Sequence, residues 1–171
     1  PPTGRTLQSG DLVSIDAGVI VEGMYSDCAI TVPVGTVSET VKKLILVTRT
    51  ALIDIARAVI KPGNTIGDIG YAVQTYVEAQ GFSVVRQLVG HGIGRHLHEE
   101  PSIPNYGQPH TGPVLKPGMA IAVEPMVNSG GADVTFQEDG WRVVTSDGGL
   151  SAHFEHTFLI TETGCEVLTA L

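Results

Sequence analysis

Four carboxylates interrupt apolar, strand-like segments of this 171-residue chain. Asp is depleted in β-strands because its short polar side chain competes for backbone hydrogen bonds and is costly to bury. Each acid alone is explained by a solvent-facing position, since alternate side chains of a strand face opposite ways. Four together, in a chain with few other acids in strands, favour a buried cluster that protons or cations must neutralise. The four residues are Asp16, Asp27, Glu124 and Glu155.

The segments around these acids predict an α+β fold. Alternating and β-branched residues over 12–19, a turn at Glu22-Gly23 and a return to Val34 predict a β-hairpin. Ser38 is a candidate N-cap for a long helix that Pro62-Gly63 ends. A second helix follows, with a capping box at Thr65 and Asp68, and runs to Gly81.

The rest of the chain is rich in strand patterns and divided by a long segment, residues 90–118, that is rich in Gly, Pro and His. Its length predicts a functional role rather than a bare connection. No linker divides the sequence, so we expect one domain over residues 1–171, with the helices on one face of a mostly antiparallel sheet. The expected strands are 83–89, 119–124, 133–137, 142–145 and 151–161.

Charge and composition exclude several classes of protein. The chain has 10 Lys and Arg against 18 Asp and Glu, a net charge of −8, which argues against a basic surface for nucleic acid or anionic membranes. No apolar run reaches the roughly 18 residues of a membrane-spanning helix. Two cysteines, Cys28 and Cys165, make no disulfide scaffold, and a cytoplasmic location is expected.

Three of the six histidines fall within residues 91–98, and His91 lies between Gly90 and Gly92. Glycine on both sides permits close backbone approach. One imidazole with four carboxylates is a mixed nitrogen and oxygen donor set, which suits a pair of Mn, Fe(II), Co or Zn ions. Such a pair activates water and polarises a carbonyl, so the pattern indicates metal-assisted hydrolysis. Spacing does not choose between peptide, phosphate and other substrates.

Several ordered motifs together resemble type I methionine aminopeptidases, from about Gly10 to the C-terminus. The resemblance implies the pita-bread fold, a pseudo-symmetric α+β architecture, with its N-terminal portion lacking here. In the family that portion supplies a helix pair, a histidine that contacts substrate and several pocket residues, all of which would precede Pro1. The motifs are Ser14-Ile15-Asp16, Tyr25-Ser26-Asp27, Gly90-His91-Gly92-Ile93-Gly94, His98-Glu99-Glu100-Pro101, Glu124-Pro125-Met126-Val127-Asn128 and Ser151-Ala152-His153-Phe154-Glu155-His156-Thr157.

The resemblance also implies a role for each ligand. Asp16 is similar to the carboxylate that chelates one metal ion, and Asp27 and Glu155 are similar to the bridging ligands. His91 and Glu124 would complete the other ion. Glu124 would also exchange a proton with the metal-bridging hydroxide that acts as nucleophile.

Three further residues match substrate positions of that family. His98 resembles a histidine that hydrogen-bonds the scissile amide and stabilises the tetrahedral intermediate. Leu97 and Trp141 match positions that line the pocket for the methionine side chain. Leu97 departs from the family pattern, because bacterial relatives commonly carry an aromatic residue there.

The remaining histidines of the motif segments are expected to be structural or exposed. An exposed loop position is expected for His96. The solvent side of a strand is favoured for His153 over a role as donor behind the ligands, and His156 is expected on the face opposite Glu155.

The implied activity is removal of the initiator methionine from nascent chains by a monomeric enzyme that needs two divalent ions. No nucleic-acid or membrane partner is expected, and docking to the ribosome is left open. Two alternatives stay open. One is an Xaa-Pro peptidase of the same fold, a prolidase or aminopeptidase P, and the other is a non-catalytic pita-bread binding module.

Overall fold

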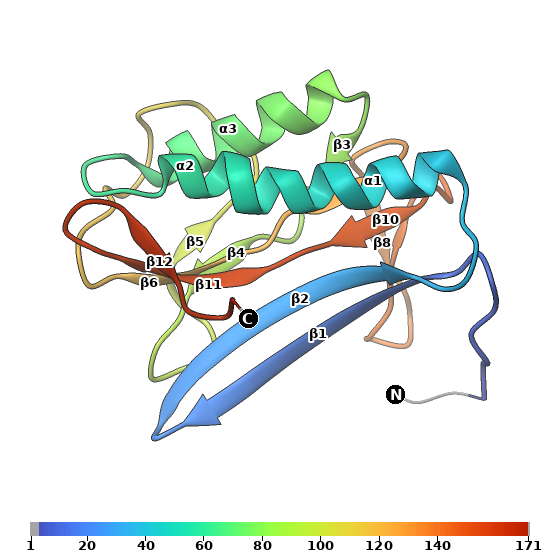
Figure 1. Cartoon of the computed structure of the whole chain (residues 1–171), viewed down its shortest axis with the longest axis horizontal. Helices are drawn as coiled ribbons and strands as arrows, with labels where there is room; N and C mark the ends of the chain where they lie inside the picture. Colours follow the sequence, from blue (N-terminus) through green and yellow to red (C-terminus); the bar gives the residue numbers. More distant parts are fainter. Residues whose placement is uncertain (1–3, 171) are drawn as a thin grey trace.

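A long curved hairpin opens the fold in the computed structural model of the chain, which describes residues 4–170 (Figure 1). Strands β1 (Leu12–Val21) and β2 (Met24–Pro33) pair antiparallel. The two-residue turn has positive φ at both Glu22 (52°) and Gly23 (80°). Such a turn matches the twist of the two strands, and the predicted hairpin is therefore confirmed.

A helical layer follows the hairpin. Helix α1 (Glu39–Thr50) begins where predicted, because the side chain of Ser38 accepts a hydrogen bond from the backbone N–H of Val41. The predicted long helix continues through a π-helical turn, η1 (Ala51–Ala56), and a short α2 (Arg57–Val59). The apolar spacing of the sequence does not reveal the π-helical turn.

Helix α3 (Ile66–Ala79) packs against η1. Its N-terminus has the predicted capping box, since the hydroxyl of Thr65 accepts from the N–H of Asp68 and the carboxylate of Asp68 accepts from the N–H of Thr65. Within residues 4–170, every helix is too short or too polar to traverse a bilayer.

The strands after the helices form antiparallel sheets that lie beneath the helical layer (Figure 1). One sheet has the order β12-β11-β6-β4-β5, another the order β10-β7-β3, and β8 pairs with β9. The core between helices and strands confirms the expected α+β arrangement. The bounds are β3 Ser83–Val84, β4 Gly90–Gly92, β5 Glu99–Ile103, β6 Ala120–Val123, β7 Met126–Asn128, β8 Val134–Phe136, β9 Val143–Thr145, β10 Ser151–His153, β11 His156–Ile160 and β12 Cys165–Val167.

Two expected strands were wrong in extent. The strand expected over 83–89 ends at Val84, and that expected over 151–161 is interrupted at Phe154 and Glu155. The Gly-rich segment 90–118 contains β4 and β5. Glycine is required in β4 by close approach, because a Cβ at Gly90 would collide with the carbonyl oxygen of Ala122 and one at Gly92 with that of Glu100.

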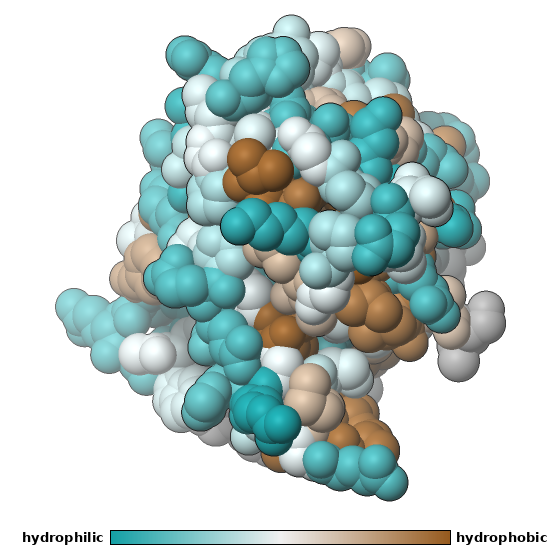
Figure 2. All heavy atoms as spheres, turned by 90° about the vertical axis from the view of Figure 1, so that its left-hand side faces the viewer, coloured by the Kyte–Doolittle hydropathy of each residue, from teal (hydrophilic) through white to brown (hydrophobic). Residues whose placement is uncertain are grey.

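Strand β1 of the hairpin is poorly covered, since none of its residues is buried. Ile20 and Val21, near the end of β1, are 58% and 64% exposed. Figure 2 shows hydrophobic surface at the lower end of the molecule, where the tip of this hairpin lies. In contrast, Ile121 of β6 and Phe158 of β11 are fully buried.

Candidate metal centre

Strand β2 is attached to the start of β11 and to Glu155, just before it, by polar contacts in antiparallel order. The hydroxyl of Thr157 accepts from the N–H of Asp27 (3.0 Å) and donates to its carbonyl (2.8 Å). Ala29 and Glu155 exchange two backbone hydrogen bonds, of 3.3 and 2.8 Å. This pairing places the carboxylates from the hairpin beside those from the packed sheets.

Asp27 and Glu155 are buried at this junction, with exposed fractions of 8% and 2%. Burial, reinforced by the negative charges of Glu124, Asp27 and Asp16, raises the pKa of Glu155 to about 9. Burial also raises the pKa of Asp27, and the Asp16 carboxylate adds to the effect. Asp16, on the exposed strand β1, completes this cluster of like charges, which without a counter-charge favours bound protons.

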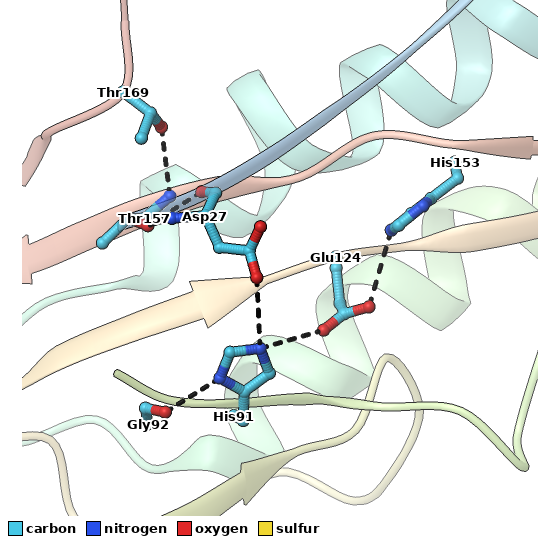
Figure 3. Close-up of polar contacts among 7 residues, drawn as sticks. All are labelled: Asp27, His91, Gly92, Glu124, His153, Thr157 and Thr169. Carbon is cyan, nitrogen blue, oxygen red and sulfur yellow. Dashed lines mark hydrogen bonds and ion pairs between the residues drawn. The ribbon is translucent and has the colours of Figure 1, made fainter. Parts of the chain in front are cut away.

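His91 of β4 faces the cluster (Figure 3). Its Nε2 lies 3.7 Å from Oε1 of Glu124 and 4.0 Å from Oδ2 of Asp27. Its Nδ1 donates to the carbonyl of Gly92 at 2.8 Å, since a carbonyl only accepts. That bond fixes the tautomer and leaves the Nε2 lone pair directed at the carboxylates, as in histidines that bind metals.

His153 lies at the same cluster, and the expectation that it faces solvent was wrong. Its side chain is only 16% exposed, and Nε2 lies 3.5 Å from Oε2 of Glu124. The Glu124 carboxylate stands between the two imidazoles in Figure 3, with one oxygen toward His91 and the other toward His153. The other expectations agree with the structure, because His156 bonds Thr169 through Nδ1 and the side chain of His96 is 82% exposed.

Two groups of donor atoms in this cluster are compact enough to hold a cation. In each group the three atoms lie within 4.8 Å of one another, and Glu155 belongs to both. One group adds Asp27 and His91, and the other adds Asp16 and His153. Oε1 of Glu155 is buried and has no hydrogen-bond partner within residues 4–170. Overlapping groups of nitrogen and oxygen donors around an unpartnered carboxylate oxygen fit a pair of divalent transition-metal ions.

A cavity of about 830 Å³ opens beside the cluster. Its lining includes Asp16, His91 and Glu124, so the donor atoms are reachable from outside. His98 also lines it, with its ring centroid 4.4 Å from that of His91 in an edge-to-face arrangement. A cavity of this size, with convergent polar groups, is typical of a small-ligand site.

The two expected pocket residues differ in position. Trp141 lines the cavity and is 74% exposed. Leu97 is half-buried and approaches β1 instead, since a Cβ added at Gly18 would be 3.6 Å from its Cδ1. The structure thus brings Trp141 to the mouth of the cavity and leaves Leu97 outside its lining.

Comparison with known proteins identifies the family that has such a cluster. The profile of metallopeptidase family M24 matches residues 1–162. The chain belongs to this family. Methionine aminopeptidase 1 of Bacillus subtilis is 52% identical over 168 residues, which cover 98% of this chain and 67% of that protein. Methionine aminopeptidase of Escherichia coli K12 is 44% identical over 169 residues and is covered to 64%.

Solved M24 structures reproduce the fold. Methionine aminopeptidase of Rickettsia prowazekii superposes with a TM-score of 0.96 at 47% identity, over 99% of this chain and 68% of that one. Prolidase of Pyrococcus horikoshii superposes with a TM-score of 0.75 at 27% identity, over 98% of this chain and 42% of that one. The fold is therefore the pita-bread fold, and the chain spans about two thirds of the length of its methionine aminopeptidase relatives.

For His153, the sequence favoured the solvent side of a strand over a role as donor behind the ligands. The signal for the donor role was present, because His153 and Glu155 are two residues apart and a strand places such residues on one face.

Proposed function

We propose that the chain carries the catalytic metal site of an enzyme that removes the N-terminal methionine from nascent polypeptides. The observation that carries the proposal is the match, over nearly the whole chain, to proteins named methionine aminopeptidase at about half identical residues. The cluster supports it, because Asp16, His91 and Glu124 line one cavity and Asp27 and Glu155 lie buried beside them.

These five residues are the proposed holders of two divalent ions, of Mn, Co, Fe(II) or Zn. Their four carboxylates supply −4 against +4 from the two ions, so loading supplies the counter-charge that the buried Asp27 and Glu155, whose pKa values are raised, otherwise lack. Bound at this place, the metal pair would supply a hydrolytic nucleophile near neutral pH and polarise the substrate carbonyl. The ring of His91 is already oriented for binding an ion, since its Nδ1 donates a hydrogen bond to the carbonyl of Gly92.

Two residues are proposed to handle substrate and protons. Glu124 is placed to accept a proton and return it to the leaving amine, because its carboxylate is largely buried and borders the cavity. His98 lines the same cavity beside His91, where its ring can donate to the scissile amide. Trp141 is proposed to contact the methionine side chain, whereas Leu97 lies outside the lining of the cavity.

The proposed cellular location follows from the proposed substrate. Nascent chains are made in the cytoplasm, which is the proposed location, and free Cys28 and Cys165 agree with it. The enzyme is proposed to be a monomer. Docking to the ribosome is tested by direct binding measurements.

Paired peptides test the proposal. The 171-residue chain, loaded with Mn²⁺ or Co²⁺, is expected to release methionine slowly from a Met-Ala-Ser peptide and to leave a Leu-Pro-Ser peptide intact. Faster cleavage of the Xaa-Pro peptide would favour the prolidase alternative, to which the structures at 27% identity give weaker support. Tight binding of a partner protein without stoichiometric metal would favour the non-catalytic module. A Glu155→Gln chain is the inactive control, because it loses the carboxylate common to both donor groups.

A further inference from the structure

His153 has the features of a metal ligand rather than of a surface histidine. Its Nε2 is buried and has no hydrogen-bond partner within the described residues 4–170. Burying a polar nitrogen without a partner is costly, so such an atom calls for an explanation. Its nearest ionisable neighbour is the carboxylate of Glu124.

The distance between these atoms leaves Nε2 of His153 without a hydrogen bond. The 3.5 Å from Nε2 to Oε2 of Glu124 is longer than an ordinary hydrogen bond of about 2.9 Å. A donor atom of His153 also lies within 4.8 Å of donor atoms of Asp16 and Glu155.

The backbone of His153 is held in place without any help from its ring. Its N–H donates to the hydroxyl of Thr31 on β2, and its carbonyl accepts from the same hydroxyl, both at 2.8 Å. The residue also pairs with Met126 of β7. A side chain on a backbone fixed from two sides pays little entropy on binding an ion, which is how ligands are preorganised.

We propose that His153 is a nitrogen ligand of the metal ion held by Asp16. Each ion of the pair would then have one imidazole, from His91 on the Asp27 side and from His153 on the Asp16 side. Glu155 would be common to both ions. The inference rests on the proposed dinuclear site and adds to it a sixth protein donor, to which the family resemblance assigned no ligand role.

Metal titration of the whole chain tests the assignment. Isothermal titration of the metal-free protein with Mn²⁺ is expected to show two binding events. His153→Gln and His153→Ala are each expected to weaken one event by at least about 100-fold, more than the loss of an outer partner costs, and to leave the other in place. His110→Gln is the matched control, because His110 is an exposed histidine that pairs with Asp68 at 3.5 Å, outside the cluster.

Two further measurements separate ligation from positioning. The visible absorption of the Co²⁺-loaded protein is expected to change in His153→Gln, since one nitrogen donor is lost. Free imidazole is expected to restore Mn²⁺ affinity to His153→Ala and to have no effect on His110→Gln. Thermal unfolding of the metal-free variants shows whether each one folds.

The outcomes distinguish this inference from the proposed function. Two Mn²⁺ sites with unchanged affinities and an unchanged Co²⁺ spectrum in folded His153→Gln would overturn the ligand assignment alone. Weaker binding with an unchanged spectrum and no imidazole rescue would also overturn it, because His153 would then only position Glu124. A wild-type chain that binds no divalent metal would overturn the proposed function as well.

Discussion

The β1–β2 hairpin and the five-stranded sheet are built from the same β-branched residues but are covered very differently. Eight of the ten residues of β1 are exposed and the other two half-buried, whereas three of the five residues of β11 are buried. The candidate centre takes Asp16 from the exposed strand β1 and Asp27 from a buried position of β2. Its other donors come from β4 and from residues next to β6 and β11. Apolar packing therefore holds the strands beside His91, Glu124 and Glu155. Hydrogen bonds from Thr31 to the backbone of His153, and between Asp27 and Thr157, help to hold the hairpin.

The sharpest test of this contrast removes the same side chain from each region. Ile121→Ala in β6 is expected to lower the free energy of unfolding by about 3 kcal/mol, because it leaves a cavity in a fully buried position. Ile20→Ala in β1 is expected to change it by less than about 0.5 kcal/mol, since Ile20 is 58% exposed. Urea unfolding of the two variants measures both. Equal losses would show that the hairpin is covered in solution.

Metal should stabilise the centre by joining the two regions. At a Mn²⁺ concentration 100 times the dissociation constant, binding to the folded state adds about 2.7 kcal/mol for one site. The midpoint of thermal unfolding is therefore expected to rise with Mn²⁺ and to rise much less in Glu155→Gln. An equal rise in both chains would place the bound ion elsewhere.

The same carboxylate predicts the pH dependence of the metal-free protein. The pKa of Glu155 is raised to about 9, so the folded state binds its proton more tightly than the unfolded state does. This contribution is complete below the ordinary value of 4.5 and is lost as the pH rises toward 9. With chelator present, stability is expected to fall from pH 6 to pH 9 and to fall less in Glu155→Gln. A difference between the two chains that does not change with pH would contradict this.

Thr157→Val tests how the hairpin is held. The substitution keeps the shape but leaves the N–H and the carbonyl of Asp27 without their hydroxyl partner, at an expected cost of about 2 kcal/mol. Because Asp27 is one of the donors, Mn²⁺ affinity is expected to fall as well. Thr135→Val, which removes an exposed hydroxyl of β8, is the control and is expected to leave Mn²⁺ affinity unchanged.

The smallest expected effect lies in the helical layer, away from the centre. Asp68→Ala removes half of the capping box of α3 and is expected to cost about 1 kcal/mol at neutral pH, with Mn²⁺ affinity unchanged. Backbone hydrogen bonding from Thr65 lowers the pKa of Asp68 below 3.8, so its contribution is present above that pH and is lost in acid. Asp54→Ala, in an exposed position of η1, is the control. An undiminished difference at pH 2 would contradict the capping role.

Local signals in the sequence predicted the elements well. Ser38, Thr65 and Asp68 form their caps with nearby backbone groups, so the helix starts could be read directly. The π-helical turn and the break at Glu155 could not be predicted in this way. The break depends on β2, which is more than a hundred residues away and forms its own backbone pair with Glu155.

In the candidate site too, features set by local sequence were predicted and features set by distant contacts were not. The donors in recognisable motifs were predicted, and the structure brings Asp16, Asp27, His91, Glu124 and Glu155 together. The direction of His153 was not predicted, because it depends on the pairing of its backbone with Thr31. Leu97 lies outside the lining of the cavity for a similar reason, since its contact is to β1 rather than to a neighbour in sequence.

Strand β4 has a consequence for any attempt to redesign this centre. Its two glycines lie so close to the carbonyls of Ala122 and Glu100 that neither position accepts even a methyl group without backbone movement. Only His91 between them is free to carry a side chain. A library that varies this strand therefore has one useful position, and changing that position removes the imidazole. New specificity has to be sought elsewhere in the lining of the cavity, around Trp141 and Val143.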